Sequence, residues 1–467
     1  MTTIELRATV DRLLEFHGRF AGWFGRSEAR EHSRAYVLGL LAPGRKSVEP
    51  LALRGVSEEP RDQGRVLAMQ RFLTNSPWNG DEVQREIQAV FAEELAPSAH
   101  GEALGIVGVI DESSFPKHGQ ESVGVARQHC GRLGKVDNCQ VGVYLIGVAP
   151  AGVALLEHRL HLNQPWIDDA QRRAKTHIPA EVEHQTKPEI AADLFRRVRD
   201  NGKVRFDWVT ADDLYGRNGD LLASLESAGQ RYVMETPSNT RFWITDPASF
   251  GQDFTQHRPT KRIERLAMRT AKRLFAELPA EAWQPICLRK GAAGPLVYEF
   301  ARVRVWAVRD RKAGPPVWAI CRRSPQQPAE RTYWVSNANE KTPLETLAGV
   351  AGTRWRVEEF FEDAKGHLGM ADYEARGWTS WHHHMTLVAL AHLYVTLARK
   401  DLRKTVPELT LDMAVRLLAS ALPLPKLTEQ DALEIVQYHL DRNRVAKNSH
   451  HKSWLARNHD LAKQVML

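Results

Sequence analysis

Two predicted strands, each followed at once by an aspartate, constrain the fold of this chain most strongly. The first covers residues 105–110 and ends at Asp111, and the second covers residues 206–211 and ends at Asp212. The continuous apolar run of the first, IVGVI, is typical of a strand that is buried on both faces of a sheet. Ligands of open α/β sheets bind just beyond the carboxyl ends of such strands. The sequence therefore predicts an α/β fold in which two acidic side chains lie close together.

The pattern along the rest of the chain divides it into five segments. Helical periodicity dominates the first and the last segment, strands alternate with helices in the second, and strands prevail in the third. The fourth segment begins with a long predicted helix. We therefore expect a helical N-terminal region (1–100), the first part of a core (101–236), a β-rich insertion (237–340), the second part of the core (341–400) and a helical C-terminal region (401–467).

Composition excludes several classes of protein. Of the 467 residues, 43% are hydrophobic and 26% are charged, which excludes a mostly disordered chain. The longest strongly apolar stretch, residues 385–398, contains His392 and is shorter than the ~20 residues of a membrane span, so it predicts a core helix. The first residues lack the apolar segment of a secretory signal, and the four cysteines form no CxxC pair. We therefore expect a cytoplasmic protein without a membrane partner.

The balance of charge favours a polyanionic partner. Lysine and arginine number 64 against 57 acids, a net charge of +7. Residues 1–100 are equally compatible with a plain helical domain and with one that grips DNA. Residues 258–273 contain seven basic side chains and one acid, in a predicted helix over 258–278. Lys261, Arg265, Arg269 and Lys272 share one face of that predicted helix, which would be either a solvated surface or a phosphate-binding surface. Residues 448–457, basic and rich in histidine, favour a frayed, solvated tail.

A third acidic element lies in the segment RWRVEEFFEDAKGHLG, residues 354–369, which overlaps a helix predicted over residues 344–366. At ~100° per residue, Arg354, Glu358 and Lys365 lie within about 40° of one another, beside an apolar stripe. The row is either a solvated face or a carboxylate flanked by two cations that grip phosphates. Hard carboxylate oxygens suit Mg²⁺ or Mn²⁺, and three acids could hold two such ions about 3.5–4 Å apart.

Four sequence blocks together resemble the bacterial insertion-sequence transposases of the DDE class, most closely the insertion sequence 701 family. The first block surrounds Asp111, the second surrounds Asp212, and the third contains Glu358. In order along the chain they are residues 110–145, residues 210–216 (TADDLYG), residues 354–369, and residues 373–394 (YEARGWTSWHHHMTLVALAHLY).

This resemblance implies a ribonuclease H-like catalytic core with the β-rich insertion placed before the last catalytic helix. It implies Asp111, Asp212 and Glu358 as the catalytic, metal-binding triad, with Asp212 favoured over Asp213 by the block Ala-Asp-x-x-Tyr-Gly. Related transposases carry a Tyr-x2-Arg-x3-Glu-x6-Lys signature around the third acid. Arg354, Glu358 and Lys365 fit that spacing, whereas Ala351 stands at the tyrosine position.

The function implied is that of a DNA transposase with two Mg²⁺ ions per active site, for which Mn²⁺ can substitute. It would nick duplex DNA at the terminal inverted repeats of its own element and join the 3′-hydroxyl ends to target DNA. Arg354 and Lys365, together with Arg265, Arg269 and Lys272 of the basic stretch, would contact DNA phosphates. A homodimer in a synaptic complex is expected, in the bacterial cytoplasm and on the nucleoid when DNA is bound. The alternatives are a nuclease of the same fold that never joins strands and a catalytically silent DNA-binding descendant.

Overall fold

The first part of the chain consists of helices. The computed structural model describes residues 2–55, 61–97, 104–291, 294–422 and 427–458. A capping box between Thr2 and Glu5 starts the first helix, because each residue satisfies a backbone N–H of the other. The helices are α1 (Thr3–Phe20), α2 (Ser27–Leu41), α3 (Val48–Arg54), α4 (Gln63–Thr74) and α5 (Gly80–Val90). The expected boundary between residues 100 and 101 lies outside the described residues.

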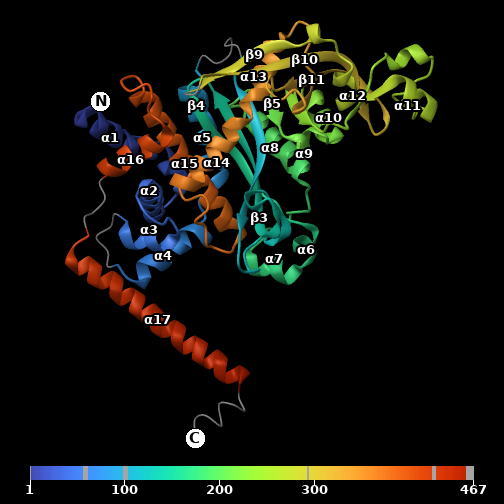
Figure 1. Ribbon diagram of the computed structural model, residues 1–467. Helices are drawn as coiled ribbons and strands as arrows, with labels where there is room; N and C mark the ends of the chain where they lie inside the picture. The colour runs from blue at the N-terminus through green and yellow to red at the C-terminus, as the bar shows by residue number, and fades with distance from the viewer. Residues whose placement is uncertain (1, 56–60, 98–103, 292–293, 423–426, 459–467) are drawn as a thin grey trace.

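Strands from the first core segment and from the insertion form one mixed sheet (Figure 1). Its order is β2-β3-β1-β5-β6-β12-β11-β10-β7-β8, with β4 beside β3 and β9 beside β10. The β1–β5 and β5–β6 pairs are parallel, and the other pairs are antiparallel. The predicted mixed α/β class is thus confirmed. The strands are β1 (Val107–Pro116), β2 (Ala126–Cys130), β3 (Lys135–Ala149), β4 (Gly152–Leu160), β5 (Trp208–Ala211), β6 (Tyr232–Thr236), β7 (Arg241–Trp243), β8 (Met268–Thr270), β9 (Gln284–Gly291), β10 (Gly294–Arg309), β11 (Lys312–Arg323) and β12 (Arg331–Ser336).

The first predicted strand continues beyond the residue at which the sequence pattern ends it. β1 does not stop at Asp111, because its pairing with β3 continues as far as Pro116. Its parallel pairing with β5 does stop there, since Ile110 opposite Ala211 is the last parallel pair. Asp111 therefore lies where β1 loses one of its two neighbours, and Asp212 comes directly after the end of the shorter strand. The two acids meet at this opening in the sheet.

The central helix α15 (Trp378–Leu402) joins the sheet to the N-terminal helices. It contacts β4 as well as α2, α4 and α5, and Figure 1 places it between them. Most of its side chains are buried, including the polar His392, which confirms the predicted core helix. Among the described residues, no helix has both the length and the apolar character needed to span a membrane.

Two predicted helices are interrupted in the structure. The helix expected over residues 344–366 divides at Arg354 into α13 (Leu344–Thr353) and α14 (Trp355–His367). The helix expected over residues 258–278 is also wrong as a single element. It consists of α11 (Lys261–Ala267), strand β8 and α12 (Ala271–Ala276).

The interruption in the basic stretch comes from burial. Met268 is buried with Trp243 and Phe254, and β8 pairs with β7 through that segment. A new helix then begins, with the Thr270 side chain accepting a hydrogen bond from the backbone N–H of Arg273. Apolar burial and strand pairing therefore outweigh the helical periodicity of the charges.

The remaining helices complete the fold. Helices α6 (Gln164–Asp168), α7 (Ala170–Thr176), α8 (Lys187–Asn201), α9 (Asp213–Gly216) and α10 (Gly219–Ser227) lie between β4 and β6 in sequence, and α16 (Leu411–Ala421) and α17 (Glu429–Arg457) follow α15. The expected frayed conformation of residues 448–457 is wrong, since they continue α17, although their exposure to solvent is as expected. Figure 1 shows α17 extending away from the body of the protein.

Candidate active site

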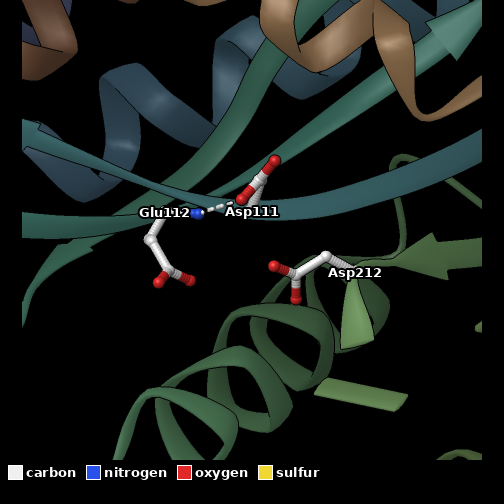
Figure 2. Close-up of side chains that lie close together, drawn as sticks. All are labelled: Asp111, Glu112 and Asp212. Carbon is white, nitrogen blue, oxygen red and sulfur yellow. Dashed lines mark hydrogen bonds between the residues drawn. The ribbon is translucent and has the colours of Figure 1, made fainter. Parts of the chain in front are cut away.

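Three carboxylates gather at the opening beside β1. Asp111, Glu112 and Asp212 each offer an oxygen, and these atoms lie within 4.8 Å of one another (Figure 2). Asp212 is also the N-cap of α9, where it accepts a hydrogen bond of 3.0 Å from the Leu214 N–H. The end of β5 and the start of α9 therefore fix Asp212 opposite β1. The predicted convergence of Asp111 and Asp212 is what the structure shows.

The electrostatics of this acidic group favour a cation. The Asp111 side chain is only 13% exposed, and burial raises the pKa of its carboxyl to about 7. Arg354 opposes this rise, whereas the negative charges of Asp212 and Glu112 add to it. Burial, followed by the charge of Glu112, also raises the pKa of Asp212. Carboxylate oxygens in such a group are the ligands that Mg²⁺ and Mn²⁺ prefer, so the donors present fit a divalent metal.

Glu112 takes part in the group although sequence reasoning did not select it. One of its carboxylate oxygens accepts a hydrogen bond of 2.7 Å from Lys187, and the other accepts one of 2.9 Å from the Tyr215 hydroxyl. These donors hold the carboxylate in place and offset part of its charge. Lys187 begins α8, so this helix is tied to the site through one ion pair.

The third predicted acid lies outside the close group and is connected to it through Arg354. Glu358 is 62% exposed and accepts a hydrogen bond of 2.7 Å from the Arg354 guanidinium. The same guanidinium donates to Asp111 at 3.1 Å and lies 3.8 Å from Glu235 of β6. Glu358 therefore faces the site across Arg354, rather than pointing to the far side of α14.

Lys365 reaches the same strand from the opposite end of α14. Its ammonium group donates to the Ser114 carbonyl at 3.4 Å and lies 5.1 Å from the ring centre of Phe115. Burial lowers its pKa to about 8, and nearby Arg132 acts in the same direction. Arg354 and Lys365 thus contact β1 at two successive points, as a row that borders the sheet would.

Two neighbouring acids point away from the group. Asp213 forms an ion pair with Arg217, which is one helical turn further along. Glu359 pairs with Arg356 at 2.6 Å on another face of α14. Sequence spacing alone left open whether Asp212 or Asp213 faces inward, and the structure assigns the inward position to Asp212.

The basic residues predicted in the insertion do not form a single row. Arg265 and Lys272 are exposed, on α11 and α12 respectively. Arg269 lies on β8 between them, where its guanidinium donates to the carbonyls of Arg265, Leu266 and Met268. Its side chain is 19% exposed and lies 3.7 Å from Glu277. The shared helical face expected for these residues is therefore wrong, because the helix ends at Ala267.

Only some of the residues that were missed had a signal in the sequence. Tyr215 lies in the block TADDLYG, three residues after Asp212, so its position near the site was accessible from the motif. Lys187 is separated from its partner Glu112 by 75 residues, and Glu235 lies in a strand that carried no motif. Contacts of this kind depend on how α8 and β6 pack, which local sequence does not specify.

Comparison with known proteins identifies the family of the chain. Residues 19–295 match the DDE superfamily endonuclease family, a region that is more than half of the chain and contains Asp111 and Asp212 but not Glu358. A probable transposase for insertion sequence element IS701 from Microchaete diplosiphon is 25% identical over 307 residues, which cover 65% of this chain and 67% of the relative.

Solved structures offer weaker likenesses. A piggyBac transposase synaptic complex with hairpin DNA aligns over 89% of this chain and 85% of that chain, at 12% identity and a TM-score of 0.35. The NurA nuclease from Sulfolobus solfataricus aligns over 57% and 82%, at 12% identity and a TM-score of 0.23. Scores this low carry no argument about the fold. The match over residues 19–295 shows the family. The chain is similar to the insertion sequence 701 transposase, and it belongs to the DDE superfamily endonucleases.

Proposed function

We propose that this protein is a DNA transposase that nicks the ends of its own insertion element and joins the freed 3′-hydroxyl groups to target DNA. The observation that carries the proposal is the meeting of Asp111 and Asp212 beside the cationic row of α14. Phosphodiester chemistry needs acids that hold metal ions and cations that bind the surrounding phosphates. This site offers both along one short stretch of β1.

Asp111, Asp212 and Glu358 are proposed to hold two Mg²⁺ ions, for which Mn²⁺ can substitute. The bound ions would activate a water or a 3′-hydroxyl and stabilise the leaving oxygen. The close approach of the Asp111 and Asp212 carboxylates supports this assignment. The Arg354 guanidinium lies between Glu358 and Asp111 and donates to both. A turn of the Arg354 side chain toward a phosphate would free Glu358 to join the two aspartates.

Arg354 and Lys365 are proposed to bind the phosphates on either side of the scissile bond. The guanidinium of Arg354 can contact two phosphate oxygens at once, whereas the ammonium of Lys365 acts as a point charge. Glu112, held by Lys187 and Tyr215, would keep β1 and α8 in register around the site rather than complete the triad.

The wider architecture follows from the same assignment. The antiparallel meander of β1, β3 and β4, continued by the parallel strands β5 and β6, supports a ribonuclease H-like core formed by residues 101–236 and 341–400. Residues 237–340 would be the insertion, and residues 1–100 would help to grip the terminal inverted repeats. Two subunits would bring two element ends together as a homodimer, in the cytoplasm and on the nucleoid.

A strand-transfer assay tests this function. Purified protein is incubated in Mg²⁺ with a duplex that ends in the pre-cut inverted repeat found beside the gene, together with a target plasmid. The wild type should join the oligonucleotide to the plasmid, and Asp111→Asn and Asp212→Asn should not. Asp213→Asn is the matched control, because that acid pairs with Arg217 outside the group. Cleavage without joining would instead identify a nuclease, and binding without cleavage would identify a silent descendant.

A further inference from the structure

The last sixteen residues of α17, which we call the distal half (residues 442–457), make few contacts with the rest of the protein. The proximal half is anchored to the N-terminal helices. Asp431 pairs with Arg61 at 2.6 Å, and the Tyr438 side chain is buried. Arg442 forms the last of these contacts, an ion pair with Glu49 of α3. Beyond it the helix continues into solvent, as Figure 1 shows.

The distal half is strongly positively charged. It contains five basic residues and no acid, namely Arg442, Arg444, Lys447, Lys452 and Arg457. Every residue from 442 to 454 is exposed. Arg444 pairs with Asp441 on its own helix, at 3.1 Å. Within the part of the chain that the structure describes, Lys447 and Lys452 form no ion pair. These charges are therefore available to a partner.

A helix of this kind gains little stability from its own sequence. Most helical stability in proteins comes from packing of an apolar face. The distal half has no such packing, and the like charges of Arg444 and Lys447, three residues apart, repel each other. A partner with dense negative charge would remove this repulsion and stabilise the helix.

Among polyanions, duplex DNA matches the length and the charge of the distal half. Sixteen helical residues extend ~24 Å at 1.5 Å per residue. Duplex DNA presents one phosphate per ~1.7 Å of axis, so several phosphates lie within that span. Exposed apolar side chains lie on both halves of α17: Leu433, Val436 and Leu440 on the proximal half, and Val445 and Trp454 on the distal half. The distal half nevertheless carries five lysines and arginines and no acid, so its charge favours a polyanion over an apolar protein surface.

We propose that the distal half of α17 binds the phosphate backbone of duplex DNA and forms an arm outside the catalytic core. The inference rests on the proposed DNA-joining function, and it assigns to that function a second DNA surface. Lys447 and Lys452, with Arg444, contact phosphates without reading bases, so the arm adds affinity for any duplex. Binding also stabilises the helix, because the phosphates supply the contacts that it lacks in the free protein.

The test compares two variants of the full chain that lose the same charge. The arm variant carries Arg444→Gln, Lys447→Gln and Lys452→Gln, since glutamine has a helix propensity close to that of lysine. The control carries Arg403→Gln, Lys404→Gln and Arg416→Gln, three exposed residues near α16. Affinity for a fluorescein-labelled duplex of arbitrary sequence, ~40 base pairs long, is measured by anisotropy between about 50 and 200 mM salt.

The arm variant should lower the log–log salt slope by ~0.9 for each phosphate that is no longer neutralised, or ~2.7 for all three. Amides of residues 442–457 in the wild type should gain protection from hydrogen exchange when the duplex is added. A slope that changes no more than in the control overturns the inference and leaves the catalytic proposal standing. So does a change confined to the oligomeric state, which would assign α17 to a second copy of the chain. Failure of the wild type to bind the duplex at all would overturn both.

Discussion

Replacing Arg354 by methionine should loosen the contact between α14 and β1. The Arg354 side chain is 27% exposed and donates to Asp111, which is the more buried of its acidic partners. Methionine keeps much of the aliphatic stem but removes the charge and every donor. The variant therefore leaves Asp111 in its buried position without the cation that now offsets its charge.

The expected cost comes mainly from that one contact. A hydrogen bond to a charged, buried group contributes ~1.5–3 kcal/mol. The contact with exposed Glu358 adds less than ~1 kcal/mol, since solvent screens it. The 3.8 Å approach to Glu235 exceeds hydrogen-bond distance and adds little. We therefore expect Arg354→Met to lower the local opening free energy of this contact by about 2–3 kcal/mol, whereas Glu358→Gln lowers it by less than ~1 kcal/mol.

Native-state hydrogen exchange of the amides in β1 and α14 measures this difference. A loss of about 2 kcal/mol corresponds to ~30-fold faster exchange. The measurement is made in EDTA and repeated in Mg²⁺, where an ion held by the acidic group should narrow the gap between variant and wild type. Exchange at the wild-type rate in EDTA would refute the reasoning. A gap that widens in Mg²⁺ would also contradict the reasoning, because the ion would then fail to replace the positive charge that Arg354 supplies to Asp111.

Three other predictions follow from the same physical reasoning. Arg265→Ala combined with Lys272→Ala should lower the salt slope of duplex binding by ~1.8, measured by anisotropy, and an unchanged slope would remove the insertion from the DNA surface. Burial raises the pKa of Glu157 to about 7 despite the nearby Arg197, so the folded state holds a proton that the unfolded state releases. The melting temperature should therefore fall as pH rises between about 4.5 and 7, and Glu157→Gln should flatten that fall. Leu390→Ala, at a fully buried position of α15, should destabilise the fold by about 2–5 kcal/mol in urea unfolding, and a decrease below ~1 kcal/mol would be inconsistent with its packing.

The buried strands and the two aspartates could be predicted from sequence because both signals are local. An apolar run such as the one before Asp111 is required by burial on two faces, and the acid that follows marks the end of that run. The run does not show where pairing ends. β1 continues as far as Pro116 because β3, much further along the chain, remains beside it.

The wrong predictions share one cause, because tertiary contacts outweigh the periodic pattern of the local sequence. The charges of the basic stretch follow a helical repeat. The helix nevertheless ends before Met268, because this side chain packs in an apolar cluster with Trp243. Glu112 should face away from Asp111 by strand alternation. Its place in the acidic group depends on Lys187 and Tyr215, whose positions are set by the packing of α8 and α9.

The sequence resemblance and the geometry of the acidic group favour different residues as the third catalytic acid. Resemblance favours Glu358, which lies across Arg354 from the group, whereas Glu112 is already within it. Cleavage of the element's end in Mg²⁺ should therefore be measured for Glu358→Ala and Glu112→Gln, with duplex binding measured in parallel. We predict that Glu358→Ala binds DNA but does not cleave it, and that Glu112→Gln retains cleavage. Normal cleavage by Glu358→Ala, with no cleavage by Glu112→Gln, would contradict the proposed triad.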